Sequence, residues 1–300
     1  MAKRESNVPA GQRRFGAHMS IAGGVHAAFR RAVEVGCDCF QVFVKNQRQW
    51  SAPVLTVEAV RLWEAARSRT GLGPVVAHAT YLINLASPDR ALWRRSIHSY
   101  TDELRRCERL GIVGLVVHPG SHNGRGEGWG IRRIAAALNV IHARTEGSRT
   151  RTVLETTAGQ GTGIGWRFEH LAGIISQTDA PHRIAVCVDT CHLFAAGYDL
   201  TTDAGYAETF QAFDRIIGLD RLLCFHMNDS KKPLGSRVDR HEHIDKGRLG
   251  RSAFRRLVND PRFLGRPMIL ETPKGADTRG RDFDRVNLRF IRSLLREPDT

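Results

Sequence analysis

Short apolar runs recur along the chain, separated by longer stretches of mixed polarity. Eight of the runs are four to six residues long, and in chain order they read FGAHM, CFQVFV, PVVAH, LVVH, TVLE, IAVCVD, LLCFH and MILE. Runs of this length that are apolar on both faces predict strands buried within a parallel sheet.

The stretches between the runs have the spacing of amphipathic helices. Ser87-Pro88-Asp89 predicts a helix start, with Ser87 as the cap and the proline and the acid in the first turn. Apolar residues then recur at helical intervals, at Trp93, Ile97, Tyr100, Leu104 and Cys107. A second series of this kind is Ile131, Ile134, Leu138 and Ile141.

Strands and helices in alternation predict an α/β fold, and eight such units predict a single TIM (β/α)8 barrel over residues 15–300. An open, doubly wound sheet is the alternative. No G-x-G-x-x-G follows the first run, which weakens the dinucleotide-binding version of that fold. Residues 1–14 are polar, basic and contain proline, so we expect a disordered arm before the barrel.

The charge balance points to a polyanionic partner. The chain has 45 basic and 31 acidic residues, a net charge of +14 and a pI near 10.3. Nucleic acid is the simplest such partner, and an acidic membrane surface is the rival. With no long apolar stretch and no signal core, we expect a cytoplasmic protein that does not span a membrane. The six cysteines form no CxxC pair and predict buried, reduced thiols.

Six successive runs, from the third to the eighth, end on a residue type that binds metals. These residues are His78, His118, Glu155, Asp189, His226 and Glu271. Because all strands of a parallel barrel end at one mouth, we expect the six side chains to converge at the C-terminal mouth of the strands. Carboxylates buried there need to be paired or coordinated.

The loops add three candidate ligands. His192 lies three residues after Asp189, and Asp239 and His241 point to one side if the chain between them is extended. Nine ligands exceed what one four-coordinate ion needs, so we expect two or three ions that share a bridging carboxylate. Imidazole and carboxylate ligands suit zinc, with manganese or iron as alternatives.

Eight longer segments, six of which contain these candidate ligands, resemble a known family. They read GAHMSIAGG, KNQRQW, HATYLINLASPD, HPGSH, ETTAGQGTGIG, DTCHLFAAGYDL, HMNDSKKPLGSRVDRHEH and LETPKG. From about Phe15 to Glu271 the chain resembles the endonuclease IV family of apurinic/apyrimidinic (AP) endonucleases. The resemblance implies a TIM barrel with three zinc ions that cuts duplex DNA 5′ to an abasic site, leaving a 3′-hydroxyl and a 5′-deoxyribose phosphate. A 3′-end-cleaning phosphodiesterase activity is a further expectation.

The resemblance also implies three ligand groups with a shared carboxylate. The first is His78, His118 and Glu155, the second is Glu155, Asp189, His226 and Glu271, and the third is His192, Asp239 and His241. Glu155 bridges the first two groups and is the expected catalytic residue, because it would orient a metal-bound hydroxide that attacks the phosphodiester.

Three residues match family positions that insert into the duplex at the lesion, namely Arg48, Tyr81 and Leu82. Two positions depart from the family pattern. Ala79 stands where some relatives have an acid, and Asp245 stands where glycine is expected. A left-handed backbone is less favourable for aspartate than for glycine, which puts the local conformation at Asp245 in question.

The expected substrate is double-stranded DNA with abasic sites, bound by a monomer. A metal-dependent sugar isomerase or epimerase is the first alternative, because it can use the same barrel and similar ligands. The third ligand group and the charge of +14 argue against it, since a neutral sugar needs no basic surface. A nonenzymatic DNA-binding or zinc-storage protein is the second alternative.

Overall fold

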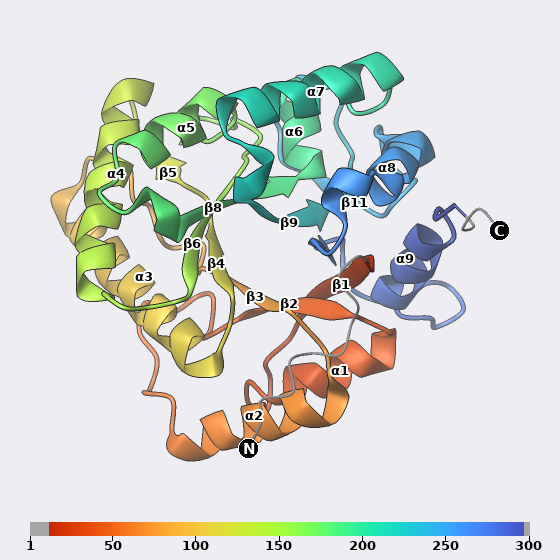
Figure 1. Ribbon diagram of the computed structural model, residues 1–300, viewed down its shortest axis with the longest axis horizontal. Coiled ribbons are helices and arrows are strands. Elements are labelled where there is room, and N and C mark those ends of the chain that lie inside the picture. Colours follow the sequence, from red (N-terminus) through yellow and green to blue (C-terminus); the bar gives the residue numbers. More distant parts are fainter. Residues whose placement is uncertain (1–11, 297–300) are drawn as a thin grey trace.

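Eight parallel strands close into a barrel in the computed structural model of the protein, which describes residues 12–296 (Figure 1). In chain order they are β1 (Arg14–Met19), β2 (Cys39–Phe43), β3 (Val75–His78), β4 (Gly114–Val117), β6 (Arg151–Glu155), β8 (Ile184–Asp189), β9 (Leu222–Met227) and β12 (Pro267–Leu270). The barrel closes where β12 pairs with β1 in parallel register. Each predicted run forms one of these strands, so the TIM barrel is confirmed and the open sheet is excluded.

Helices surround the strands (Figure 1). They are α1 (Ala27–Val35), α2 (Val57–Thr70), α3 (Arg90–Leu110), α4 (Glu127–Arg144), α5 (Phe168–Ser176), α6 (Thr190–Ala196), α7 (Asp203–Ile216), α8 (Gly250–Asn259) and α9 (Phe283–Arg292). Short 3-10 turns at Pro181–Arg183, Leu219–Arg221 and Pro261–Phe263 precede three of the strands. No helix in residues 12–296 is long and apolar enough to cross a bilayer.

The predicted cap of α3 is wrong by two residues. Asp89 is the N-cap, and its carboxylate accepts hydrogen bonds from the backbone N–H groups of Ala91 and Leu92. The Ser87 hydroxyl oxygen instead accepts from the Asp89 N–H, at 3.2 Å. Pro88 therefore precedes the helix, and the carboxylate satisfies two of the amide groups that every helix start leaves unpaired.

Apolar side chains fill the barrel below its mouth. The inner cluster consists of Cys39, Val76, Val116, Val153, Ala185, Cys187, Leu223, Cys224 and Ile269. All six cysteines of the chain are buried and unpaired, as predicted. Because this layer is packed, polar groups collect above it at the ends of the strands.

The barrel begins earlier than predicted. Arg14 is the first residue of β1, paired with Pro267, and its guanidinium donates to the carbonyl oxygen of Gly73 at 2.7 Å. Arg13 donates to the carbonyl oxygen of Asp260 at 2.7 Å. These contacts assign the last residues of the predicted arm to the barrel, while residues 1–11 lie outside the described part of the chain.

Two small antiparallel pairs shape the loops at the mouth. One joins β5 (Gly120–Ser121) to β7 (Gly163–Ile164), and the other joins β10 (Asp229–Ser230) to β11 (His241–Glu242). The second pair folds the long segment between β9 and α8 back over the barrel. That fold brings residues 239–241 to the ends of the strands.

Candidate metal centre

Glu155 lies fully buried at the end of β6, among four histidines. One carboxylate oxygen, Oε2, is 3.2 Å from Nε2 of His78 and 3.2 Å from Nε2 of His118. The other, Oε1, is 2.9 Å from Nδ1 of His226 and 3.3 Å from Nδ1 of His192. A single carboxylate thus contacts imidazoles from four different segments of the barrel.

A second cluster lies beside it, around His226. Nδ1 of His226 is 3.1 Å from a carboxylate oxygen of Glu271 and 4.0 Å from one of Asp189. The potential ligand atoms of Glu155, Asp189, His226 and Glu271 all lie within 4.8 Å of one another. This is the second of the three groups that the resemblance implied.

The third group comes from α6, the loop before β11 and the first residue of β11. Nε2 of His192 is 3.1 Å from one oxygen of Asp239, and Nε2 of His241 is 3.3 Å from the other. Asp239 and His241 therefore point to the same side, as the extended spacing predicted. All nine predicted ligands, including the group of His78, His118 and Glu155, are brought together at the mouth.

The close contacts shift the pKa values of these groups in opposite directions. Burial would raise the pKa of Glu155, but the imidazoles of His226 and His118 hold it well below its usual range. Burial would lower the pKa of His226, but the carboxylates of Glu271 and Glu155 raise it to about 10. Burial likewise opposes the low pKa of Asp239, which the hydrogen bond and charge of His192 lower to about 2. The imidazoles and carboxylates of the cluster therefore stabilise one another's charged forms.

The residues present fit a set of divalent transition-metal ions. Nε2 of His241 is buried without a hydrogen-bond partner, although it lies 3.3 Å from Asp239 and 3.6 Å from Asp189. A ring nitrogen that faces two carboxylates in this way has the position of a ligand to a shared cation. Imidazole and carboxylate donors without a thiolate suit zinc, manganese or iron. The nearby thiol of Cys191 stays protonated at neutral pH, because burial and Asp189 raise its pKa to about 12.

The family model for the xylose isomerase-like TIM barrel matches residues 29–294. A protein named probable endonuclease 4 from Chloroflexus aggregans is 53% identical over 283 residues, which cover 94% of this chain and 98% of that protein. The chain belongs to the endonuclease IV family. A second relative, probable endonuclease 4 of Geobacter sulfurreducens, is 52% identical over 95% of both chains.

Solved structures agree with this assignment. The crystal structure of endonuclease IV from Thermus thermophilus has a TM-score of 0.83 and 38% identity, and the match covers 94% of this chain and 98% of that one. A D-psicose 3-epimerase structure is also similar, with a TM-score of 0.65 at 15% identity. The second likeness is one of fold alone, because that identity is too low to carry function over.

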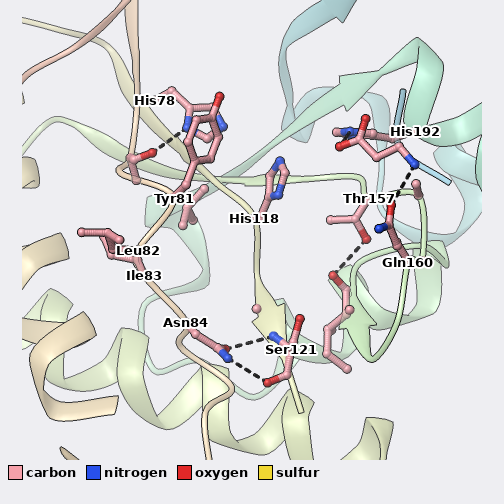
Figure 2. A pocket seen from close by; sticks show the side chains of 18 of the residues that line it. His78, Tyr81, Leu82, Ile83, Asn84, His118, Ser121, Thr157, Gln160 and His192 are labelled. Carbon is pink, nitrogen blue, oxygen red and sulfur yellow. Dashed lines mark hydrogen bonds and ion pairs between the residues drawn. The ribbon is translucent and has the colours of Figure 1, made fainter. Parts of the chain in front are cut away.

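The loops of this endonuclease IV family member that carry Arg48, Tyr81 and Leu82 lie side by side at the mouth. Tyr81 is 62% exposed, and its ring centroid is 5.3 Å from that of His78 (Figure 2). Tyr81 and Leu82 line a cavity of about 520 Å³ that His78, His118 and His192 also line. Arg48 is exposed on the neighbouring loop. The Thr80 hydroxyl donates a hydrogen bond to the carbonyl oxygen of Gln47, which joins the two loops.

Two amides that sequence reasoning missed hold the carboxylates in place. Nε2 of Gln41 donates to Glu271 at 2.5 Å, and Oε1 of the same amide lies 2.8 Å from Nε2 of His226. Nδ2 of Asn228 donates to Asp189 at 2.7 Å. Groups that orient ligands in this way tune both affinity and geometry. The signal for Gln41 was a glutamine in the middle of the apolar run CFQVFV.

The structure shows the backbone conformation at Asp245 and the contact made by Ala79, the two positions that depart from the family pattern. Asp245 has φ = 65°, so its backbone is left-handed, the conformation that the expected glycine would favour. Aspartate is one of the few other residues that adopt it at modest cost. Ala79 is buried, and its carbonyl oxygen lies 2.7 Å from Nδ1 of His78. That contact fixes Nδ1 as the protonated nitrogen and leaves Nε2 free to face Glu155.

A buried ion pair anchors the two mouth loops to α3, and no sequence pattern predicted it. Nζ of Lys45 lies 3.0 Å from a carboxylate oxygen of Glu103, and both side chains are 1% exposed. Lys45 also donates to the carbonyl oxygen of Trp50 at 2.9 Å. The second oxygen of Glu103 accepts from the Thr80 N–H at 3.0 Å. One pair therefore fixes the loop of Arg48 and the loop of Tyr81 relative to each other.

We expect Lys45→Met to lower the free energy of unfolding by about 3–5 kcal/mol, because it leaves the Glu103 carboxylate buried without its cation. Adding Glu103→Gln should restore part of the loss, since the amide removes the buried charge and still accepts from Thr80. Urea unfolding monitored by circular dichroism measures both variants. Arg61→Met, in an exposed pair with Glu58, is the control and should change little. A double variant less stable than the single one would contradict this account.

Proposed function

We propose that the protein is an AP endonuclease that hydrolyses the phosphodiester 5′ to abasic sites in duplex DNA, leaving a 3′-hydroxyl and a 5′-deoxyribose phosphate. The observation that carries the proposal is the buried carboxylate of Glu155, shared between two groups of potential ligands at an open mouth. The names of relatives at about half identity support a nuclease. We also propose that the protein removes blocking groups from DNA 3′ ends, that it is a monomer and that it is located in the cytoplasm.

Three zinc ions are part of the proposal, with manganese or iron as alternatives at some positions. His78, His118 and Glu155 would hold one ion, and Asp189, His226 and Glu271 would hold the second together with Glu155. His192, Asp239 and His241 would hold the third. Ions bound there would activate water and offset negative charge on the phosphate oxygens.

The chain's own residues bind and orient the substrate. Glu155 is fully buried between four imidazoles, so it would act by fixing the ligands that position the attacking water. Tyr81 and Leu82 would wedge against the bases beside the lesion, and Arg48 would fill the vacated stack. An abasic nucleotide lacks stacking and pairing, so its extrusion costs less than the few kcal/mol an intact nucleotide requires. The basic surface supplies affinity for the backbone.

The decisive experiment is incubation of the purified protein with a duplex that has one synthetic abasic site, followed by mapping of the cut on a sequencing gel. We expect a single nick 5′ to the site with a 3′ end that a polymerase extends. An otherwise identical duplex without the lesion is the control. If the abasic duplex stays intact while a ketose sugar is epimerised, the sugar epimerase alternative is correct. The third ligand group and the charge of +14 argue against that outcome.

Zinc binding to the metal-free protein should release protons at pH 7.5. The pKa of His226 is raised to about 10, so its ring is protonated at neutral pH, and a metal binds only the neutral form. Apparent zinc affinity should therefore rise with pH from about 6 to 8. Calorimetry in buffers of different ionisation enthalpy measures the release, and elemental analysis should find more than one equivalent of metal. Binding without proton release, or a firm count of one ion or none, would contradict the multinuclear site.

A further inference from the structure

The N-terminal halves of α3 and α4, with the loop before α4, carry a dense group of arginines. We call them the arginine strip, and they are Arg90, Arg94, Arg95, Arg125, Arg132 and Arg133. Within residues 12–296, every arginine that forms a salt bridge with a carboxylate lies outside the strip. The six arginines of the strip therefore have no carboxylate partner among these residues. Burial and the nearby charge of Arg90 lower the pKa of Arg133, as expected for crowded like charges.

The two acids at the starts of these helices are engaged elsewhere. The Asp89 carboxylate accepts from the N–H groups at the start of α3. Glu127 accepts from Nε1 of Trp166 at 3.1 Å and lies 3.2 Å from Nε2 of His170. Neither acid neutralises the strip, so its positive charge faces solvent.

Three arginines of the strip stack their guanidinium groups on the rings of tryptophans. Arg95 lies 4.5 Å from the ring centroid of Trp50, and Arg133 lies 3.9 Å from that of Trp93. Arg125 lies over Trp129, at 5.3 Å. Stacking occupies the flat face of a guanidinium and leaves its N–H edge available for bonds to phosphate. Nε of Arg133 already donates to the carbonyl oxygen of Ser87 at 3.3 Å, which leaves its two terminal nitrogens for a ligand. These arginines are therefore oriented before any ligand arrives.

The strip follows two loops that line the cavity at the mouth, because Asn84 on the first loop and Ser121 on the second are both part of its lining. The loop after His78 leads to α3, and the loop after His118 leads to α4. The Asn84 amide donates to the carbonyl oxygen of Ser121 at 3.0 Å and accepts from its N–H at 2.9 Å, so the two loops run side by side (Figure 2). Helices α3 and α4 lie next to each other around the barrel (Figure 1).

We propose that the arginine strip binds the phosphate backbone of one arm of the duplex that flanks the lesion. The proposal rests on the proposed function, because it takes the DNA to be seated at the mouth. Duplex DNA presents about one negative charge per 1.7 Å of its axis, which matches a row of cations better than a single small anion does. The contact is independent of sequence and fixes position, not chemistry.

Two other polyanions fit the strip less well. Single-stranded nucleic acid binds by stacking its bases on open aromatic faces, and here arginines cover faces of the three tryptophans. A membrane surface calls for apolar side chains that insert between lipids. The large exposed apolar residues of the described chain are Val33, Val54, Val57, Tyr81, Leu234, Leu264 and Leu295, and none of them lies on α3 or α4.

The test removes three exposed, unstacked charges, with Arg90→Gln, Arg94→Gln and Arg132→Gln in one variant. The matched control is Arg69→Gln, Arg109→Gln and Arg144→Gln in one variant. It removes the same amount of charge, but from the C-terminal ends of α2, α3 and α4, whereas the strip lies at the N-terminal ends of α3 and α4. Binding is measured against salt concentration, with a long duplex that carries an abasic analogue and a nonhydrolysable linkage on its 5′ side. Two further duplexes are used, of which one is shortened on the 5′ side of the lesion and the other on the 3′ side.

The strip variant should bind the long duplex roughly tenfold more weakly, and its salt slope should fall by about 2–3, since each phosphate contact contributes about 0.9. The deficit should vanish on one of the shortened duplexes. The control should change less than about twofold, and single-turnover incision at saturation should be the same for all proteins. Equal losses in strip and control variants, or a deficit that persists on both shortened duplexes, would overturn the proposal. Failure of the unmodified protein to incise would overturn the proposed function instead.

Discussion

Replacing Glu155 with glutamine is expected to reduce incision of abasic DNA by roughly a thousandfold or more. Loss of one preorganised electrostatic group in an active site costs about 10²–10³ in rate, and Glu155 contacts four imidazoles at once. The amide keeps the size of the side chain but could not balance the two ions that are proposed to share the carboxylate. Single-turnover kinetics with saturating zinc measures the rate, and elemental analysis of the same sample measures the metal.

Glu146→Gln, at an exposed position on the far side of α4 from the mouth, is the matched control and should incise normally. Circular dichroism of both variants checks that the barrel is intact. Near-normal turnover by Glu155→Gln at unchanged metal content would mean that the reaction is centred elsewhere.

Tyr81→Ala combined with Leu82→Ala should lower incision of abasic DNA by roughly a hundredfold. Both side chains line the cavity beside His78, and Tyr81 is 62% exposed, so their loss removes little packing. In the proposed function they hold the opened duplex, and unstacking a base step costs a few kcal/mol that such a wedge would have to supply. Affinity for the abasic duplex should fall much more than affinity for an undamaged one.

Val54→Ala with Val57→Ala provides the control, because both valines are about four-fifths exposed, at 79% and 82%, and lie outside the cavity lining. Metal content and melting temperature should be unchanged in both double variants. If the Tyr81 and Leu82 variant melts early, or loses affinity for both duplexes equally, these residues are part of the core or contact the backbone in general.

The predictable part of this structure lies in its strands. A buried parallel strand is apolar on both faces, so a His, Asp or Glu at its end stands out, as Glu155 and Asp189 do. Because a parallel barrel has a single mouth, position along each strand is enough to place residues such as His78 and Glu271 together. The grouping of the ligands came from the resemblance, since strand ends alone do not give distances between side chains.

The parts that escaped prediction depend on contacts between distant residues or on competition between neighbours. Lys45 and Glu103 meet across 58 positions of the chain, and nothing in either local pattern marks a buried ion pair. Asp89 displaced Ser87 as the cap of α3 because a carboxylate accepts from two amide groups at once. Arg14 belongs to β1 because it pairs with Pro267 of β12. The polar residues around Arg14 in the sequence give no sign of that pairing.

The anchoring of both mouth loops on Lys45 and Glu103 has a consequence for the search for damage. Loops that are already fixed lose little conformational entropy on binding, so in the proposed function the protein would act as a stiff template and the DNA would have to bend. The frequency of productive encounters then depends on the flexibility of the DNA around each lesion. We expect abasic sites flanked by TA or CA steps, which kink easily, to be processed faster than sites within stiff A-tracts.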